Sequence, residues 1–320
     1  METREIGNSG IKVHPLAFGG NVFGWTIDEK QSFKILDAFV DAGLNLIDTA
    51  DVYSRWAPGN KGGESETIIG NWLKNSGKRS KVVIATKVGK PMAEDKKGLS
   101  RDYITKAVED SLKRLQTDYI DLYQSHDDDK ETPLIETLET YSDLINQGKV
   151  RAIGASNFGG ERLKEALQVS RDNGLAAYEC LQPEYNLYSR EHYETDLEPV
   201  CRERNVGVIT YYSLASGFLT GKYRSENDLS QSSRGQGVKK FLNPRGYKIL
   251  SGLDKIAAEY NSTPASIALA WLMARRGITA PIASATSIEQ LDDLVKSTEL
   301  KLSSGAIDLL NIASSYTNTI

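Results

Sequence analysis

A carboxylate, an ammonium and an imidazole recur at equal spacing in the first half of the chain. Asp48, Lys87 and His126 each stand at the end of a short apolar run, and the two intervals between them are the same length. An interval of this size holds one strand and one helix. If the strands are parallel, their carboxyl ends lie at one edge of the sheet, and we expect the three side chains to converge there.

The pairing of Asp48 with Lys87 has two interpretations. Asp48 follows the apolar Leu46-Ile47 pair, so its carboxylate is expected to be buried and to need a partner, which Lys87 on the next strand can supply. The pair could be purely structural. Alternatively, it serves Tyr53, because a nearby ammonium favours the phenolate and would let Tyr53 exchange a proton nearer neutral pH.

His126 gains its meaning from its position. A lone histidine at the end of a strand is more often a core residue, and the aspartates Asp127–Asp129 that follow are most simply a solvated loop. At the same sheet edge as Tyr53 and Lys87, however, His126 could donate a hydrogen bond to a carbonyl oxygen and orient it. The constellation therefore predicts proton transfer at a carbonyl group.

Alternating strands and helices are expected to position these side chains. Short runs rich in β-branched residues predict eight strands, at Leu16–Gly20, Leu44–Ala50, Lys81–Val88, Tyr119–His126, Val150–Ser156, Ala177–Gln182, Gly207–Tyr212 and Thr279–Ala285. Stretches of helical period lie between them, with capping signals at Ser100 and Pro133, at Asp28–Asp41, Arg101–Leu115, Leu134–Ile145, Gly160–Asp172, Glu191–Arg204, Thr263–Arg275 and Ile288–Ser297.

This alternation predicts an α/β fold of class (β/α)8, a closed TIM barrel that uses residues 1–320 as one domain. A doubly wound open sheet has the same alternation of strands and helices, but eight units without a separate C-terminal domain favour the barrel. A Gly-, Ser- and Lys-rich segment, Thr220–Arg245, interrupts the seventh unit and is a candidate for a functional loop. A final helix is expected at Ser303–Ser315.

Composition excludes several classes of protein. The 39 Lys and Arg against 43 Asp and Glu give a net charge of −4, which argues against a nucleic-acid-binding surface. Neither a signal-peptide core nor an apolar run long enough to cross a membrane occurs. Two cysteines, Cys180 and Cys201, are expected to be reduced core thiols, with a single disulfide between them as the alternative. Three widely spaced histidines predict no metal site. We therefore expect a cytoplasmic protein without nucleic-acid or membrane partners.

Six motifs in register carry a resemblance to a known family. They are Asn45-Leu46-Ile47-Asp48-Thr49-Ala50-Asp51-Val52-Tyr53, Ile84-Ala85-Thr86-Lys87, Asp121-Leu122-Tyr123-Gln124-Ser125-His126, Gly154-Ala155-Ser156-Asn157-Phe158, Leu181-Gln182-Pro183-Glu184-Tyr185-Asn186, and the segment Ser213–Tyr223. With this set the sequence resembles the aldo-keto reductases, in particular their potassium-channel-β-subunit-like branch.

The resemblance implies a nicotinamide dinucleotide, NADP(H) more often than NAD(H), bound across the mouth of the barrel, and a small carbonyl compound as substrate. It implies Asp48, Tyr53, Lys87 and His126 as the catalytic set, with Tyr53 as general acid. Cofactor contacts are expected from Asn21, Ser156, Asn157, Gln182, Tyr211, Ser213, Leu214, Gly217, Leu219, Lys222, Arg234, Ser284, Thr286 and Gln290. Within this set, Ser156, Asn157 and Gln182 would bind the carboxamide and Tyr211 would stack on the nicotinamide ring.

One departure concerns the adenosine 2′-phosphate. Members of the family commonly carry an arginine after the eighth strand, where this chain has Thr286. A hydroxyl can bind phosphate but brings no charge, so the choice between NADPH and NADH stays open. A clamp formed by Arg234, Lys239 and Lys240 could supply the missing cations, and a merely solvated basic loop is the alternative.

Aromatic side chains in the first two loops suggest the substrate wall. Phe23, Trp25 and Trp56 lie in sequence near Tyr53 and could form a pocket for an aromatic or apolar aldehyde, or could simply pack the loops. Two other functions stay open: a nicotinamide-binding regulatory subunit with slow turnover, and a barrel with lyase or isomerase chemistry. The sequence does not fix the oligomeric state.

Overall fold

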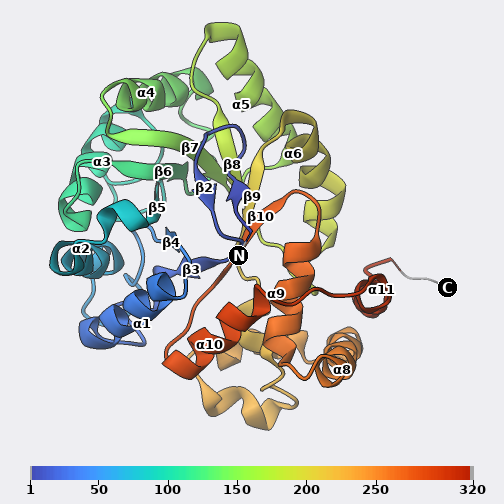
Figure 1. Cartoon of the computed structure of the whole chain (residues 1–320). Coiled ribbons are helices and arrows are strands. Elements are labelled where there is room, and N and C mark those ends of the chain that lie inside the picture. Colours follow the sequence, from blue (N-terminus) through green and yellow to red (C-terminus); the bar gives the residue numbers. More distant parts are fainter. Residues whose placement is uncertain (1, 318–320) are drawn as a thin grey trace.

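Eight parallel strands close into a barrel in the computed structural model, which describes residues 2–317 (Figure 1). The strand order around the barrel is β10-β3-β4-β5-β6-β7-β8-β9, so the last strand closes on the first. The strands are β3 (Ala17–Gly19), β4 (Leu46–Asp48), β5 (Val83–Val88), β6 (Ile120–Ser125), β7 (Val150–Ser156), β8 (Tyr178–Gln182), β9 (Gly207–Thr210) and β10 (Ile278–Ala283). The predicted (β/α)8 barrel is confirmed, with most strands shorter than the apolar runs.

Helices surround the barrel and follow their local signals. The Asp28 side chain caps the helix that begins at Glu29 by accepting a hydrogen bond of 2.8 Å from the Gln31 amide. The Ser100 side chain caps the helix that begins at Arg101 by accepting from the Tyr103 amide. The main helices are α1 (Glu29–Asp41), α2 (Glu64–Ser76), α3 (Arg101–Leu115), α4 (Leu134–Asn146), α5 (Gly160–Asn173), α6 (Glu198–Arg204), α8 (Pro244–Glu259), α9 (Pro264–Ala274), α10 (Ile288–Ser297) and α11 (Ser304–Ala313). A π-helical segment, η3 (Tyr193–Leu197), precedes α6.

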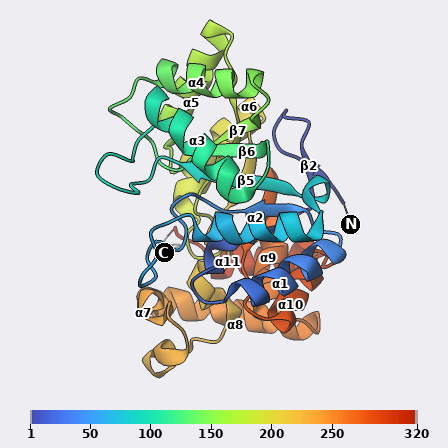
Figure 2. The same ribbon diagram turned by 90° about the vertical axis from the view of Figure 1, so that its left-hand side faces the viewer.

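An N-terminal hairpin, which the sequence did not predict, closes one end of the barrel. Strands β1 (Arg4–Glu5) and β2 (Lys12–Val13) pair in antiparallel fashion. Ile6, Ile11 and Val13 pack against inward-facing barrel residues such as Leu46 and Leu122 in a separate apolar cluster. Figure 2 shows the hairpin at the opposite end of the molecule from the segment that carries α7. The open end of the barrel is therefore the end at which the strands finish.

The segment Thr220–Arg245 is more ordered than a plain loop. It contains η5 (Glu226–Gln231), α7 (Gly235–Val238) and η6 (Lys239–Phe241), and Ser225 with Asp228 forms a capping box. A Cβ on Gly235 would lie 1.8 Å from the Leu229 carbonyl oxygen, so only glycine lets these turns pack. Helices α2 and α8 were also missed.

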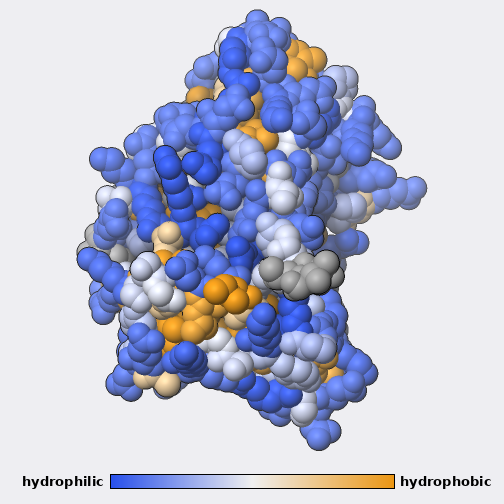
Figure 3. Space-filling view, turned by 90° about the vertical axis from the view of Figure 1, so that its right-hand side faces the viewer, coloured by the Kyte–Doolittle hydropathy of each residue, from blue (hydrophilic) through white to orange (hydrophobic). Residues whose placement is uncertain are grey.

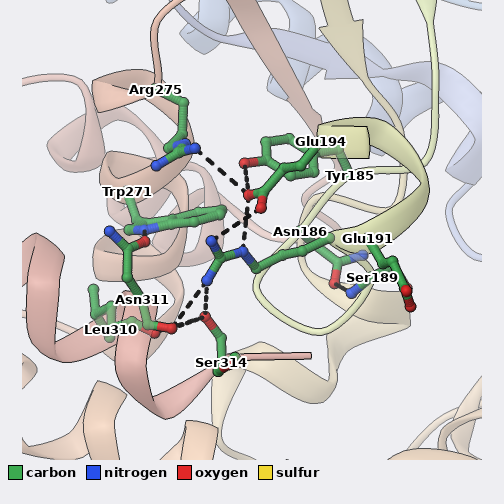
Figure 4. A network of polar contacts seen from close by, with 12 residues as sticks. Tyr185, Asn186, Ser189, Glu191, Glu194, Trp271, Arg275, Leu310, Asn311 and Ser314 are labelled. Atoms are coloured by element: carbon green, nitrogen blue, oxygen red, sulfur yellow. Dashed lines mark hydrogen bonds and ion pairs between the residues drawn. The ribbon is translucent and has the colours of Figure 1, made fainter. Parts of the chain in front are cut away.

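A buried ion pair attaches the C-terminal helix α11 to the barrel (Figure 4). The Arg190 guanidinium donates to both carboxylate oxygens of Glu194, at 2.8 and 3.1 Å. Its third nitrogen donates to the Asn311 carbonyl at 3.0 Å and the Ser314 hydroxyl at 2.8 Å. Trp271 of α9 donates to the Asn311 side chain at 3.0 Å. These bonds explain how a helix added after the eighth unit stays fixed.

The face that carries α11 is largely hydrophilic, with one apolar patch near its centre (Figure 3). Between residues 2 and 317, no helix has both the length and the apolar character that a bilayer crossing requires.

Candidate active site

The inward-facing rows of the barrel change from apolar to polar as the strands end. Side chains two residues apart share a face, so Leu46 leads to Asp48, and Ala85 leads to Lys87. Strands β4 and β5 pair with Asp48 beside Ala85, which places Lys87 just beyond Asp48. The row of β6 continues to His126 in the same way. The alternation that fills the core therefore also delivers the reactive groups to the open end.

A cavity of about 880 Å³ opens at this end. Its lining includes Asp48, Tyr53 and His126 among the predicted catalytic residues. Of the predicted cofactor residues it includes Asn21, Ser156, Asn157, Gln182, Tyr211, Ser213, Leu214, Gly217, Lys222, Arg234, Ser284, Thr286 and Gln290. Lys87 lies directly behind the wall. Leu219 does not reach the cavity, because its side chain is fully buried among core residues.

The Lys87 ammonium is the centre of the predicted catalytic cluster. It donates to Asp48 Oδ2 at 2.8 Å, to the Thr49 carbonyl at 2.7 Å and to the Tyr53 hydroxyl at 3.0 Å. The other Asp48 oxygen accepts from Gln182 Nε2 at 2.8 Å. All donors of the ammonium are thereby used, and the Tyr53 oxygen is held between a cation and a carboxylate oxygen 3.3 Å away.

The protonation states suit an acid rather than a base at Tyr53. Burial, followed by the charge of Asp48, holds the pKa of the Tyr53 phenol well above its usual value. Against the expectation that Lys87 brings this pKa nearer to neutral, burial and the charge of Asp48 set its direction. Burial also lowers the pKa of Lys87, against the opposing effect of Asp48. Tyr53 thus keeps its proton at neutral pH.

His126 is neutral and has a ring nitrogen to spare. Burial, and then the positive charges of Lys87 and Lys90, hold the pKa of its imidazole well below the usual value. Its ring centroid lies 6.0 Å from that of Tyr53, and its Nδ1 atom is buried without a hydrogen-bond partner. A neutral imidazole donates from one nitrogen and accepts at the other, so it can orient a polar group beside Tyr53.

The residues predicted to bind the nicotinamide and its carboxamide form two hydrogen-bonded pairs on neighbouring strand ends. Asn157 donates to the His126 carbonyl at 2.8 Å and accepts from the Tyr211 hydroxyl at 2.8 Å. Ser156 pairs with Gln182 across β7 and β8, and its hydroxyl donates to the Gln182 carbonyl at 2.8 Å. The structure therefore brings together all four side chains, with amide and aromatic surfaces lining the cavity next to Tyr53.

The backbone after β9 adopts an unusual conformation. Tyr212, Ala215 and Ser216 have positive φ angles of 50°, 47° and 57°, and Gly217 has 94°. Side-chain-bearing residues in this region are strained, and such strain is found at ligand-binding loops. Successive N–H groups in left-handed turns can form an anion-binding concavity. Lys222 lines the same part of the cavity, so this segment combines backbone donors with a cation.

The far end of the cavity lies at the start of α10. The Ser284 hydroxyl lies 2.7 Å from the Gly19 carbonyl oxygen and 2.9 Å from Asn21 Oδ1. These contacts join the end of β10 to the end of β3. Thr286 donates from its amide and its hydroxyl to the Gln290 side chain, at 2.9 and 3.0 Å. No arginine replaces the missing cation in this cluster of hydroxyl and amide groups.

Of the three residues of the hypothetical basic clamp, one lines the cavity. Arg234 lines the cavity, stacks 5.1 Å above the Trp25 ring and has its Nη2 atom buried without a partner. Lys239 instead pairs with Glu226 at 2.9 Å, and Lys240 lies over the Phe241 ring at 5.0 Å. Arg234 is thus the member of the trio that faces the cavity.

The aromatic substrate wall is only partly present. Trp56 lines the cavity and packs edge-on against Tyr53, with ring centroids 5.9 Å apart. Trp25 contacts Trp56 at 5.6 Å but stands behind it. Phe23 is corrected from wall to core: it is 0% exposed and stacks on Phe18 at 5.3 Å.

Several cavity residues were missed from the sequence. Tyr212 and Lys90 face the cavity near Tyr53 and His126, and Ser232 and Ser233 precede Arg234 in the long segment. Tyr212 stands next to the expected Tyr211, and Lys90 is three residues beyond Lys87, so their proximity to the motifs was the available signal. Within residues 2–317, no group of three or more His, Cys, Asp or Glu side chains could hold a metal ion.

Comparison with known proteins gives a consistent result. Residues 15–314 match the aldo/keto reductase family. The chain is 35% identical over 318 residues to an uncharacterized oxidoreductase, YrpG, of Bacillus subtilis, covering 97% of this chain and 95% of that protein. It is 36% identical over 315 residues to the aldo-keto reductase YhdN of the same organism, covering 95% and 91%. A probable voltage-gated potassium channel subunit beta of Arabidopsis thaliana is 34% identical over 309 residues, covering 94% and 92%.

Proposed function

The chain belongs to the aldo/keto reductase family of oxidoreductases, and from this premise we propose that it reduces aldehydes or ketones to alcohols with NADPH or NADH. The observation that carries the proposal is the Tyr53 hydroxyl, held 3.0 Å from the Lys87 ammonium at the edge of a large cavity. Members of this family generally bind a nicotinamide dinucleotide, which supplies the hydride when bound.

The donor set of the cavity fits such a cofactor. Asn157 and Gln182 offer amide groups beside Tyr211, which suits a carboxamide on a flat ring. The strained turn around Ala215 and Ser216, with Lys222, suits a pyrophosphate. Arg234 has an unpartnered buried nitrogen that suits another phosphate oxygen.

The proton is supplied by Tyr53. Its raised pKa keeps the phenol protonated until a carbonyl oxygen gains negative charge as hydride arrives at the carbon. His126, neutral and beside Tyr53, holds that oxygen in place by a hydrogen bond. When the proton leaves Tyr53, the Lys87 ammonium stabilises the phenolate at 3.0 Å, and Asp48 keeps the ammonium aimed.

The regulatory alternative needs cofactor binding but no proton transfer. Asp48, Tyr53, Lys87 and His126 are joined in one hydrogen-bonded and packed cluster, which favours turnover.

The test is a fluorescence titration of the purified protein with NADPH and then NADH, followed by absorbance at 340 nm with a panel of aldehydes. We expect saturable binding and steady oxidation of the cofactor in the presence of aldehyde. Binding without turnover on every aldehyde would support the regulatory role, and no binding of either cofactor would refute both. Tighter binding of NADH than of NADPH would indicate that Thr286, where the family commonly has an arginine, changes the cofactor preference.

A further inference from the structure

Lys90 is a cavity-lining cation that the reaction described above does not use. It follows β5 after Gly89 and lines the same cavity as Tyr53, His126 and Trp56. Lys87, three residues earlier, has all its donors engaged by the catalytic cluster. Lys90 makes no hydrogen bond to any other described side chain, and its ion-pair partner is the Asp127 carboxylate, at 3.6 Å.

The pairing with Asp127 leaves Lys90 available. The two side chains are 37% and 44% exposed, and a separation of 3.6 Å is longer than a charge-assisted hydrogen bond. An ion pair of this kind between exposed groups contributes little free energy. An anion entering the cavity can therefore replace Asp127 as the partner of Lys90 at small cost.

The backbone around Lys90 is fixed. The His126 amide donates to the Val88 carbonyl at 2.8 Å, which keeps the ends of β5 and β6 side by side. The next residue, Pro91, accepts a hydrogen bond of 2.7 Å from the Arg55 guanidinium, so Arg55 holds the loop and does not face the cavity itself. These two hydrogen bonds fix the backbone on both sides of Lys90, so its side chain is held in position beside the cavity.

The charge of Lys90 lies close to the reacting groups. It contributes to the lowered pKa of both His126 and Lys87. At this end of the cavity the one lining carboxylate is Asp48, which Lys87 already neutralises at 2.8 Å. Trp56 and Tyr212, 48% and 52% exposed, offer flat surfaces at the mouth. The region thus combines a free cation with aromatic walls.

We propose that Lys90 binds an anionic group of the carbonyl substrate, so that the preferred substrates are aromatic or apolar aldehydes and ketones that carry a carboxylate or a phosphate. The inference rests on the proposed reductase function and names its substrate class. Lys90 acts on specificity, since proton transfer belongs to Tyr53. Asp127 competes with the substrate for the same ammonium.

The experiment compares 4-formylbenzoate with its neutral methyl ester, at saturating cofactor, in the wild type, Lys90→Met and Lys97→Met. Lys97 is an exposed lysine of the same loop that does not line the cavity, so its replacement removes the same charge. We expect the acid-to-ester ratio of kcat/KM to fall about tenfold in Lys90→Met, through KM, and to stay constant in Lys97→Met. Asp127→Asn should raise the ratio. A second anionic aldehyde, 4-formylphenyl phosphate, shows which anion is preferred.

A binding measurement separates this inference from the proposed function. Quenching of tryptophan fluorescence by 4-(hydroxymethyl)benzoate reports the anion without turnover, and we expect it to weaken about tenfold in Lys90→Met while NADPH binding is unchanged. An unchanged ratio in an active Lys90→Met enzyme, or a loss confined to NADPH binding, overturns the role of Lys90. Failure of the wild type to reduce any aldehyde overturns the proposed function and, with it, the substrate class.

Discussion

Two regions of this protein differ in how completely their buried polar side chains are satisfied: the ion pair of Arg190 and Glu194, and the wall of the cavity. In the cluster of Arg190 and Glu194, the guanidinium makes four hydrogen bonds to protein atoms, and Tyr185 donates a further one to Glu194 at 2.7 Å. Around the cavity, His126 Nδ1 and Arg234 Nη2 are buried without partners. A satisfied network stabilises one conformation, whereas an unsatisfied one is prepared for a molecule that completes it.

The electrostatics follow the same division. Burial raises the pKa of Glu194, but hydrogen bonds from Arg190 and Tyr185 more than offset this and lower it overall. Near Lys87, burial and the neighbouring charge of Glu66 raise the pKa of the Asp51 carboxyl to about 8, against weaker effects of Arg114 and the Val52 amide. Neither Asp51 oxygen has a well-formed hydrogen bond. Asp51 is thus an unsatisfied acid held protonated next to the proposed catalytic cluster.

The largest expected effect is on the reactive side of this comparison. Tyr53→Phe removes the proton donor and leaves the ring, so kcat should fall by about 10²-fold or more, with the Kd for NADPH nearly unchanged. Stopped-flow oxidation of NADPH at 340 nm measures the step directly. Retention of more than about a tenth of the wild-type rate would contradict Tyr53 as the general acid.

A smaller effect is expected on the satisfied side. Arg190→Met leaves Glu194 buried with Arg275 at 3.5 Å as its remaining charged neighbour. The free energy of unfolding should fall by about 3 kcal/mol, with KM and the Kd for NADPH unchanged. Urea denaturation measures this loss. Arg202→Met is the control, because its contact with Glu198 is long, at 3.8 Å, and half exposed, and should matter by about 0.5 kcal/mol or less.

If Arg190→Met changed cofactor affinity while leaving stability intact, the network would belong to the site and the comparison would fail.

The smallest effect concerns Asp51 and depends on pH. Its folded pKa of about 8 lies above the unfolded value near 4, so the folded state holds an extra proton between these pH values. Stability from this group is full below about pH 4 and is lost as pH rises toward 8. Asp51→Asn removes this loss, so its stability relative to that of the wild type should increase from pH 5 to pH 8, by at most about 1.4 kcal/mol for each pH unit.

Denaturation at both pH values measures this difference. Asp121→Asn is the matched control, since that buried carboxylate has Arg79 and Arg151 as partners, each at 2.8 Å. It should lose stability at pH 8, where Asp51→Asn gains. If both variants changed the free energy of unfolding equally at pH 8, the lack of hydrogen-bond partners at Asp51 would not affect stability.

The sequence predicted the barrel because each strand is a compact apolar run. The strand Val150–Ser156 was placed with its observed bounds, and the set of Asp48, Lys87 and His126 was found from spacing alone. Helix α2 was missed because Gly62 and Gly63 and the charged residues after them look like loop, although Gly63 takes the left-handed conformation that starts the helix, with φ 88°. The hairpin β1–β2 was missed because strands of two residues have no period.

The positions of side chains were harder to predict than the helices and strands that carry them. Phe23 and Trp56 are both aromatic loop residues, but one stacks on Phe18 in the core and the other lines the cavity. The direction of the Tyr53 pKa is set by burial and by the charge of Asp48, and the spacing of the motifs contains neither the burial nor the distance. Lys90 lines the cavity directly after Gly89, whose φ of 121° favours glycine and could not be read from the spacing of the motifs.

The N-terminal hairpin has a consequence for biosynthesis. Arg4 donates to the Ile278 carbonyl at 2.8 Å and to the Met273 carbonyl at 2.9 Å, so the hairpin is fastened to the segment that carries the eighth barrel strand. Neighbouring βα units can pair as they leave the ribosome, but the Arg4 contacts and the pairing of β10 with β3 must wait until β10 emerges. Closure of the barrel is therefore a late step of folding, because it joins segments that lie far apart in the sequence.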